Sequence, residues 1–162
     1  SDTPTHLELY KAFESIGGIT HTHSPYATIF AQAKREIPCF GTTHADHFYG
    51  SIPVTRLLCE GEVADGYEIN TGKIIIERFR SLDPAWMPAV LVAGHAPFTW
   101  GTSASASVMH SLILERVAEM ALGTLHVNPE AMEIPDYIQK KHYLRKHGAD
   151  AYYGQMNRDN EP

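Results

Sequence analysis

The chain has 162 residues, a length typical of a single domain with a sizeable hydrophobic core. Hydrophobic residues make up 43% and charged residues 20%, which excludes a disordered or fibrous chain. The net charge of −6 gives no support to nucleic-acid binding, and no apolar run approaches the roughly 20 residues that cross a membrane. No signal peptide is visible in the given sequence, and two cysteines are too few for a disulfide framework, so we expect reduced thiols in a cytoplasmic protein.

The first third of the chain predicts a helix, a strand and a second helix. Asp2 or Thr3 is the expected cap of the first helix. An extended segment over 19–23 follows, and the second helix covers about 26–34. The apolar stripe expected along the first helix is Leu7, Leu9, Tyr10 and Phe13.

The middle of the chain predicts a short strand over 37–43, running into a polar, non-periodic loop over 42–50. Three isoleucines at 74–76 fit either a strand, through their β-branching, or a helix that begins at Thr71. We favour the helix. The apolar run 89–94 is the clearest candidate for a buried strand.

The last third predicts a turn and two helices. Residues 97–101 are expected to turn away from the preceding strand, and Ser103 to cap a long helix that reaches about residue 123. A final helix covers 135–147. The residues expected on the packed face of the long helix are Val108, Leu112, Leu114, Val117, Ala118 and Ala121. Because strands and helices alternate, the predicted class is α/β.

Three histidines form the most informative pattern. His21 and His23 are two residues apart in an extended segment, so their side chains point the same way. His95 directly follows the buried strand predicted at 89–94. Three imidazoles with an open position are the ligand set of a catalytic zinc site. On spacing alone, ordinary polar residues at strand ends are supported equally well.

Five short blocks stand in a fixed order along the chain. They are SDTPTH at 1–6, GITHTHS at 18–24, GTTHAD at 41–46, HAPFTWG at 95–101, and KHYLRKHG at 141–148 with YYGQ at 152–155. In this order they resemble the pentulose-phosphate 4-epimerases of the class II aldolase/adducin superfamily. The resemblance implies a three-layer α/β/α domain over residues 1–155, with a central, mostly antiparallel sheet. In the family a further segment precedes this domain. Residues 156–162 are expected to form a polar tail.

The resemblance also implies a reaction, the interconversion of L-ribulose 5-phosphate and D-xylulose 5-phosphate in arabinose or ascorbate use. The hydrogen on C4 is not acidic, so the route is retro-aldol cleavage of the C3–C4 bond, rotation of the aldehyde and re-addition. A zinc ion, with manganese as the alternative, would serve as Lewis acid. His21, His23, His95 and the carboxylate of Asp2 match the ligand positions, although Asp2 could equally be a plain helix cap.

By the same resemblance, Asp46 and Tyr153 are the two acid–base groups, each reaching the metal of a neighbouring subunit in a homotetramer. Ser1, His142 and Arg145 match substrate-binding positions, with Arg145 binding the phosphate or orienting Tyr153. His142 and Arg145 lie three residues apart and share a helix face, so a solvated basic face is an equally supported reading.

Two other functions stay open. A class II aldolase acting on fuculose or rhamnulose phosphate shares the metal histidines, although the blocks around Asp46 and Tyr153 favour an epimerase. An adducin-like interaction module would be expected to lose those histidines. His44 is expected to support Asp46, and His47 stands where the epimerases are expected to carry tyrosine, which predicts an altered rate or pH optimum.

Overall fold

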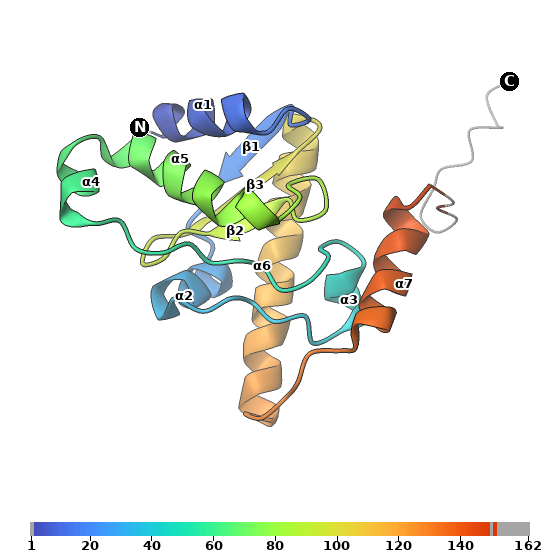
Figure 1. The fold of residues 1–162 in the computed structure, drawn as a ribbon. Coiled ribbons are helices and arrows are strands. Elements are labelled where there is room, and N and C mark those ends of the chain that lie inside the picture. Colours follow the sequence, from blue (N-terminus) through green and yellow to red (C-terminus); the bar gives the residue numbers. More distant parts are fainter. Residues whose placement is uncertain (1, 150, 152–162) are drawn as a thin grey trace, which may run out of the picture.

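The computed structural model describes residues 2–149 and residue 151 (Figure 1). Its elements are α1 (Thr3–Ala12), β1 (Gly18–His21), α2 (Pro25–Ala33), α3 (Thr42–Ala45), α4 (Glu60–Ala64), α5 (Tyr67–Arg78), the 3-10 helix η1 (Phe79–Ser81), β2 (Ala89–Leu91), β3 (Pro97–Gly101), α6 (Ala104–Val127) and α7 (Asp136–His147). Within the described residues the three strands form one antiparallel sheet in the order β1-β3-β2. Ser1, Tyr153 and the predicted tail lie outside them.

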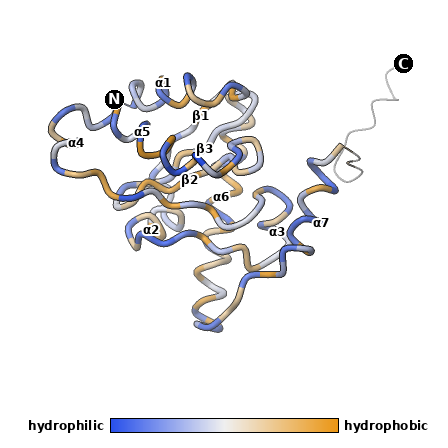
Figure 2. The backbone as a smooth tube through the Cα atoms, viewed as in Figure 1, coloured by the Kyte–Doolittle hydropathy of each residue, from blue (hydrophilic) through white to orange (hydrophobic). Residues whose placement is uncertain are grey.

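Helices cover both faces of the sheet. Successive side chains of β3 point to opposite sides of the sheet, and each side contacts different helices. The Trp100 ring lies 5.1 Å from that of Phe13, after α1, and 5.0 Å from that of Phe79 in η1. On the other face the Thr99 hydroxyl donates to the main-chain oxygen of Ser107 in α6 at 2.9 Å. These contacts confirm the predicted α/β/α layering. Figure 2 shows that hydrophobic segments, in orange, recur along α6.

The start of α6 lies directly against the sheet because glycines face it. A Cβ atom on Gly18 would lie 2.4 Å from the Cα of Ala104, and one on Gly101 would lie 2.7 Å from the Cβ of Ala106. The Ser103 hydroxyl accepts a hydrogen bond from the Ala106 N–H at 3.1 Å, so the predicted N-cap of this helix is confirmed. Close contact at these points holds the first turns of α6 against the start of β1 and the end of β3.

Glu115, in the middle of α6, caps the N-terminus of α2. Its two carboxylate oxygens accept from the N–H groups of Tyr26 at 2.9 Å and Ala27 at 3.0 Å. The negative charge and the two acceptors satisfy N–H groups that have no partner inside the helix. Because His23 lies just before α2, this contact also anchors the segment that carries it.

The prediction of a strand over 37–43 was wrong. Only Ile37 pairs, in an isolated bridge with Ile52, because Pro38 has no N–H with which to continue a ladder. The predicted turn over 97–101 was also wrong. That segment is β3, the central strand, and Pro97 is tolerated as its first residue.

The predicted loop over 42–50 begins with the short helix α3. The isoleucines at 74–76 lie in α5, which confirms the helical interpretation. Thr71, however, lies inside α5, where its hydroxyl donates to the main-chain oxygen of Tyr67 at 2.8 Å, and does not cap the helix. Both cysteines are free, as predicted. Among the described helices, none is long and apolar enough to cross a membrane.

Two predicted apolar stripes are only partly buried. On α1, Leu9 is buried but Leu7 is 51% exposed. On α6, Leu114 is buried, whereas Val108 and Leu112 are 50% and 61% exposed. Apolar residues surround much of α6, so periodicity alone could not identify the face that packs on the sheet. Besides Leu9 and Leu114, the predicted positions that face the core are Val117, Ala118 and Ala121 on α6 and Phe13 after α1.

Candidate metal centre and acid–base cluster

The side chains of His21, His23 and His95 come together at one end of the sheet. Each offers a ligand nitrogen within 4.8 Å of the others, and their ring centroids are 4.9 to 5.0 Å apart. His21 ends β1, His23 lies two residues further on, and His95 follows Gly94, whose φ of +73° makes the turn after β2. We call these three residues the histidine triad; as a group they could hold a metal ion.

The environment of His21 leaves one defined nitrogen for a metal. Its Nδ1 lies 2.9 Å from the main-chain oxygen of Pro97, which can only accept, so Nδ1 carries the hydrogen and Nε2 has the free lone pair. The ring stacks on that of Phe98 with the ring centroids 4.1 Å apart. Burial lowers the pKa of His21 and of His95, and His21 and His23 lower that of His95 further. These shifts favour the neutral imidazole that a metal requires.

Side chains around the triad alternate between the two faces of β1, as the sequence predicts. Thr20 precedes His21 and points to the opposite side of β1, where its hydroxyl lies 2.8 Å from the hydroxyl of Ser107 in α6. The histidines therefore share one side because the threonine side chain is held on the other.

Asp2 occupies the N-cap position of α1, but its side chain makes no capping hydrogen bond. Its negative charge acts to raise the pKa values of both His21 and His95, against the larger lowering by burial. It is not in the group of ligand atoms that lie within 4.8 Å of one another. Asp2 therefore stays a predicted fourth ligand.

Tyr67 is a neighbour of the triad that the sequence did not single out. It is the first residue of α5, and its hydroxyl oxygen lies 3.2 Å from Nδ1 of His95. On the other side of the His95 ring, Nε2 lies 3.1 Å from Nε2 of His23. A tyrosine 28 positions before His95 carries no local signal, so only the packing of α5 reveals this contact.

Asp46, directly after α3, is held by side chains of α7. Arg145 donates to both carboxylate oxygens, through Nη2 at 2.9 and 2.8 Å and through Nε at 3.2 Å. Nδ1 of His142 lies 3.0 Å from one of these oxygens, and Nζ of Lys146 lies 3.4 Å from the other. Nε2 of His147 donates to the main-chain oxygen of Asp46 at 2.9 Å. These contacts dock α7 on α3.

The Asp46 carboxyl is ionised at neutral pH. Burial alone would raise its pKa, but the hydrogen bonds from Arg145 and His142 and the charge of Lys146 outweigh burial and lower the pKa. Arg145 and His142 were predicted to bind substrate, or in the case of Arg145 to orient Tyr153. Their described contacts are with Asp46, and Tyr153 lies outside the described residues.

His44 and His47 lie close to Asp46 in the sequence, and their lowered pKa values favour the neutral ring. Burial lowers the pKa of each to about 4, and the charge of Lys146 lowers that of His47 further. His44 donates from Nε2 to the main-chain oxygen of Gly50 at 2.9 Å. This hydrogen bond links His44 to the loop after α3. His44 makes no described contact with the Asp46 carboxylate.

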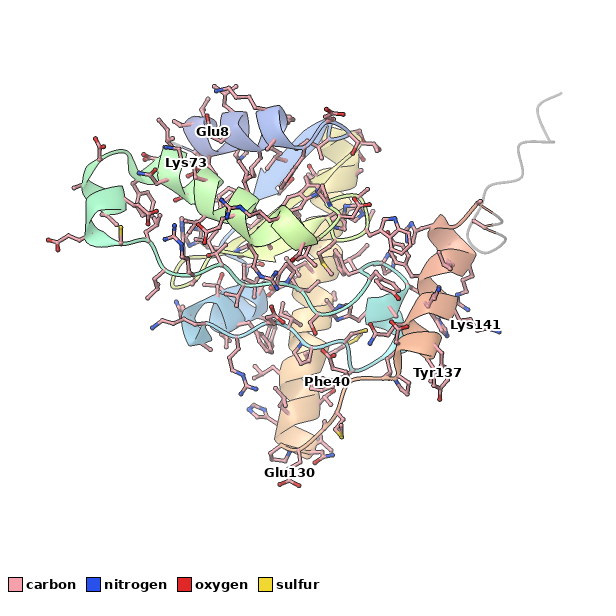
Figure 3. All side chains as sticks on the ribbon, in the orientation of Figure 1. Glu8, Phe40, Lys73, Glu130, Tyr137 and Lys141 are labelled. Atoms are coloured by element: carbon pink, nitrogen blue, oxygen red, sulfur yellow. The ribbon has the colours of Figure 1, made fainter. Side chains whose placement is uncertain are left out.

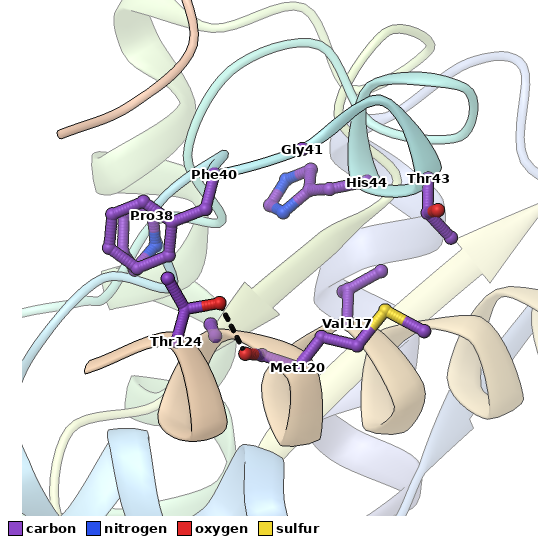
Figure 4. Close-up of a pocket in the computed structure, with 9 residues that line it drawn as sticks. Pro38, Phe40, Gly41, Thr43, His44, Val117, Met120 and Thr124 are labelled. Atoms are coloured by element: carbon purple, nitrogen blue, oxygen red, sulfur yellow. Dashed lines mark hydrogen bonds between the residues drawn. The ribbon is translucent and has the colours of Figure 1, made fainter. Parts of the chain in front are cut away.

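A separate cavity of about 360 Å³ lies between α6 and the segment 38–44 (Figure 4). Its wall is largely apolar, with Phe40 on one side and Val117 and Met120 on the other. The ionisable group that lines it is His44, whose ring is neutral and hydrogen-bonded. The His44 ring is thus already engaged by Gly50. Among the described residues we take two groups as the candidate functional groups: the histidine triad, and Asp46 with His142, Arg145 and Lys146.

Residues 1–122 match the family described as Class II Aldolase and Adducin N-terminal domain. This chain belongs to the class II aldolase and adducin family. It is 50% identical over 155 residues to proteins named L-ribulose-5-phosphate 4-epimerase UlaF from Salmonella paratyphi C (strain RKS4594) and Salmonella choleraesuis (strain SC-B67). The match covers 96% of this chain and 68% of each relative.

Solved structures show the same fold. An L-fuculose 1-phosphate aldolase superposes with a TM-score of 0.71 at 19% identity, covering 90% of this chain and 63% of that one. The L-fuculose 1-phosphate aldolase from Glaciozyma antarctica PI12 superposes with a TM-score of 0.65 at 19% identity, covering 86% and 48%. The chain thus spans less than two thirds of each of these structures. At such identity the likeness concerns the fold alone.

Proposed function

We propose that this chain belongs to a metal-dependent L-ribulose-5-phosphate 4-epimerase, which interconverts L-ribulose 5-phosphate and D-xylulose 5-phosphate. The observation that carries the proposal is the convergence of the histidine triad. It occurs in a chain that is 50% identical over 155 residues to proteins named as that epimerase. The substrate is accordingly a pentulose phosphate, in arabinose or ascorbate catabolism.

Zinc is the metal that we propose, with manganese as the alternative, held by His21, His23, His95 and Asp2. Three imidazoles and a carboxylate suit zinc and other first-row ions. A bound metal ion supplies a Lewis acid that polarises the ketone of the substrate. Neutral imidazoles leave most of the positive charge of the ion available for that purpose.

Asp46 is the group that we propose to exchange protons with the C4 hydroxyl on one face of the substrate. Its lowered pKa keeps the carboxylate ionised at neutral pH, so the group is in the form that can accept the hydroxyl proton as the C3–C4 bond breaks. Tyr153 is the proposed partner on the other face, where re-addition to the rotated aldehyde requires a proton. Arg145 and His142 orient the carboxylate of Asp46 in this scheme.

A homotetramer with active sites between subunits is part of the proposal. The described contacts of the triad reach Pro97, Phe98 and Tyr67, whereas those of the Asp46 side chain reach α7. A neighbouring subunit could therefore bring the two groups together. The outer side of α6 supports such contact, since it exposes the apolar residues Val108, Met109 and Leu112.

We further propose a cytoplasmic location with no nucleic-acid or membrane partner. A phosphorylated sugar is retained inside the cell by its charge, and the acidic net charge of the chain does not favour nucleic acid. Both cysteines are free thiols, as a reducing compartment requires.

The test compares purified wild-type protein with Asp46→Asn for metal content and for conversion of L-ribulose 5-phosphate, before and after chelation. We expect conversion that vanishes with the chelator and returns with zinc, and a variant that keeps its metal but loses epimerisation. Asp65→Asn, at an exposed position after α4, is the matched control and should behave as wild type.

Each other outcome has a definite meaning. Bound metal with cleavage to an aldehyde and a ketone, but without epimerisation, would favour the class II aldolase. Neither metal nor turnover would favour the adducin-like interaction module. Full epimerase activity in Asp46→Asn would remove Asp46 from the mechanism.

A further inference from the structure

The His95 ring lies between two different partners, one at each nitrogen. Nε2 faces the triad, 3.1 Å from Nε2 of His23, and Nδ1 faces the Tyr67 hydroxyl at 3.2 Å. The rings of Tyr67 and His95 lie 6.1 Å apart at 42°, so the phenol meets the imidazole through its hydroxyl group and does not stack on it. Tyr67 itself is 36% exposed.

The hydrogens on these atoms follow from what a metal requires. A nitrogen that binds a metal uses its lone pair, so metal binding at Nε2 leaves the hydrogen of the neutral His95 ring on Nδ1. That N–H then donates to the phenol oxygen of Tyr67, which accepts and keeps its own O–H for another partner. In His21 the Pro97 carbonyl accepts in the same way.

We propose that Tyr67 is a positioning residue for the metal centre, which accepts a hydrogen bond from Nδ1 of His95 and so directs Nε2 of that ring toward the metal. This inference rests on the proposed metal-dependent function. The corresponding partner of His21 is a main-chain oxygen, which no substitution removes. Tyr67 is a side-chain partner from a separate helix, α5, and couples the position of that helix to metal binding.

The loss of a hydrogen-bond partner behind a ligating histidine lowers metal affinity by about 10- to 100-fold. The contact here is at 3.2 Å and partly exposed, which puts the expected effect of Tyr67→Phe near the lower end, about tenfold. The phenylalanine ring keeps the packing of Tyr67, so the fold should be unaffected.

The experiment titrates zinc into the metal-free full chain in competition with a chromogenic chelator, for wild type, Tyr67→Phe and the control Tyr10→Phe. Tyr10 is 43% exposed on α1 and has no described hydrogen bond, so its substitution removes the same hydroxyl from a site away from His95. We expect weaker zinc binding in Tyr67→Phe only, with unchanged urea midpoints of the metal-free proteins.

A second readout is the visible spectrum of the cobalt-loaded proteins, which reports ligand geometry and is not moved by a general change in stability. It should change in Tyr67→Phe and stay as in wild type in Tyr10→Phe. If wild type binds zinc, His23→Gln abolishes that binding, and Tyr67→Phe matches wild type in both readouts, the role of Tyr67 is refuted and the metal centre stands. If wild type binds no zinc, or His23→Gln binds it equally well, both proposals fail.

Discussion

The ion pair between Arg145 and Asp46 should make a measurable contribution to stability, unlike the exposed pairs of the same protein. Arg145 makes three contacts of 2.8 to 3.2 Å with the carboxylate, and the two side chains are only 22% and 14% exposed. Hydrogen bonds to charged groups contribute about 1.5–3 kcal/mol and exposed pairs about 0.2–1 kcal/mol. For this partly screened pair we expect a coupling free energy of about 2 kcal/mol.

The assay is a double-mutant cycle with Arg145→Gln, Asp46→Asn and the double variant, followed by urea unfolding at pH 7. The control cycle uses Arg116→Gln and Glu119→Gln, a pair on α6 at 2.8 Å whose side chains are 72% and 40% exposed. Its coupling should be about 0.3–0.5 kcal/mol. Equal couplings in the two cycles would refute the argument that burial and multiple contacts strengthen the Asp46 pair.

The same cycle has a defined pH dependence. The folded-state pKa of Asp46 is lowered, so its stabilising contribution is complete above the unfolded-state pKa, about 3.9, and is lost as the pH falls below that value and through the folded-state pKa. The coupling measured at pH 7 should therefore persist at pH 5 and decline below about pH 4. A coupling that did not change with acid would mean that the contact does not depend on the ionised carboxylate.

Three further substitutions test the fold and the assembly. Glu115→Gln removes the charge and one acceptor oxygen at the start of α2 and should lower the free energy of unfolding by about 1–2 kcal/mol in urea titrations, whereas an unchanged midpoint would refute the capping role. Gly18→Ala places a Cβ 2.4 Å from the Cα of Ala104 and should cost about 1–3 kcal/mol by the same assay; a neutral result would show that α6 can move away freely. Leu112→Glu, at an exposed apolar position of α6, should shift the mass measured by light scattering from tetramer to smaller species, and a wild-type protein that is already monomeric would contradict the proposed assembly.

Local sequence signals succeeded where neighbouring residues decide the outcome. The spacing of His21 and His23 placed both side chains on one face of an extended segment, and the structure brings the two rings to a centroid distance of 5.0 Å. Ser103 caps α6 because a serine hydroxyl reaches an N–H three residues ahead. Both effects act within a few residues, so sequence alone carries them.

Sequence reasoning failed where the deciding contacts are distant. Residues 97–101 resemble a turn, with a proline and a glycine at their ends, yet they form the central strand because β1 and β2 pair on either side. On α7 the side chains of Tyr137 and Lys141 point outward (Figure 3), whereas those of His142 and Arg145 contact Asp46. Both faces of the helix are polar, so polarity does not distinguish them. Only the position of Asp46 shows which side is docked.

The sequence by itself therefore determined the type of chemistry, through an i, i+2 pair of histidines, a third after an apolar strand, and blocks that resemble one enzyme family. Tertiary structure alone decided which groups meet: His95 with Tyr67 across 28 positions, and Asp46 with Arg145 across 99. The physical reason is that side-chain direction along a strand or helix is a local property of the backbone. Partners from separate elements are chosen instead by how the buried faces of those elements pack.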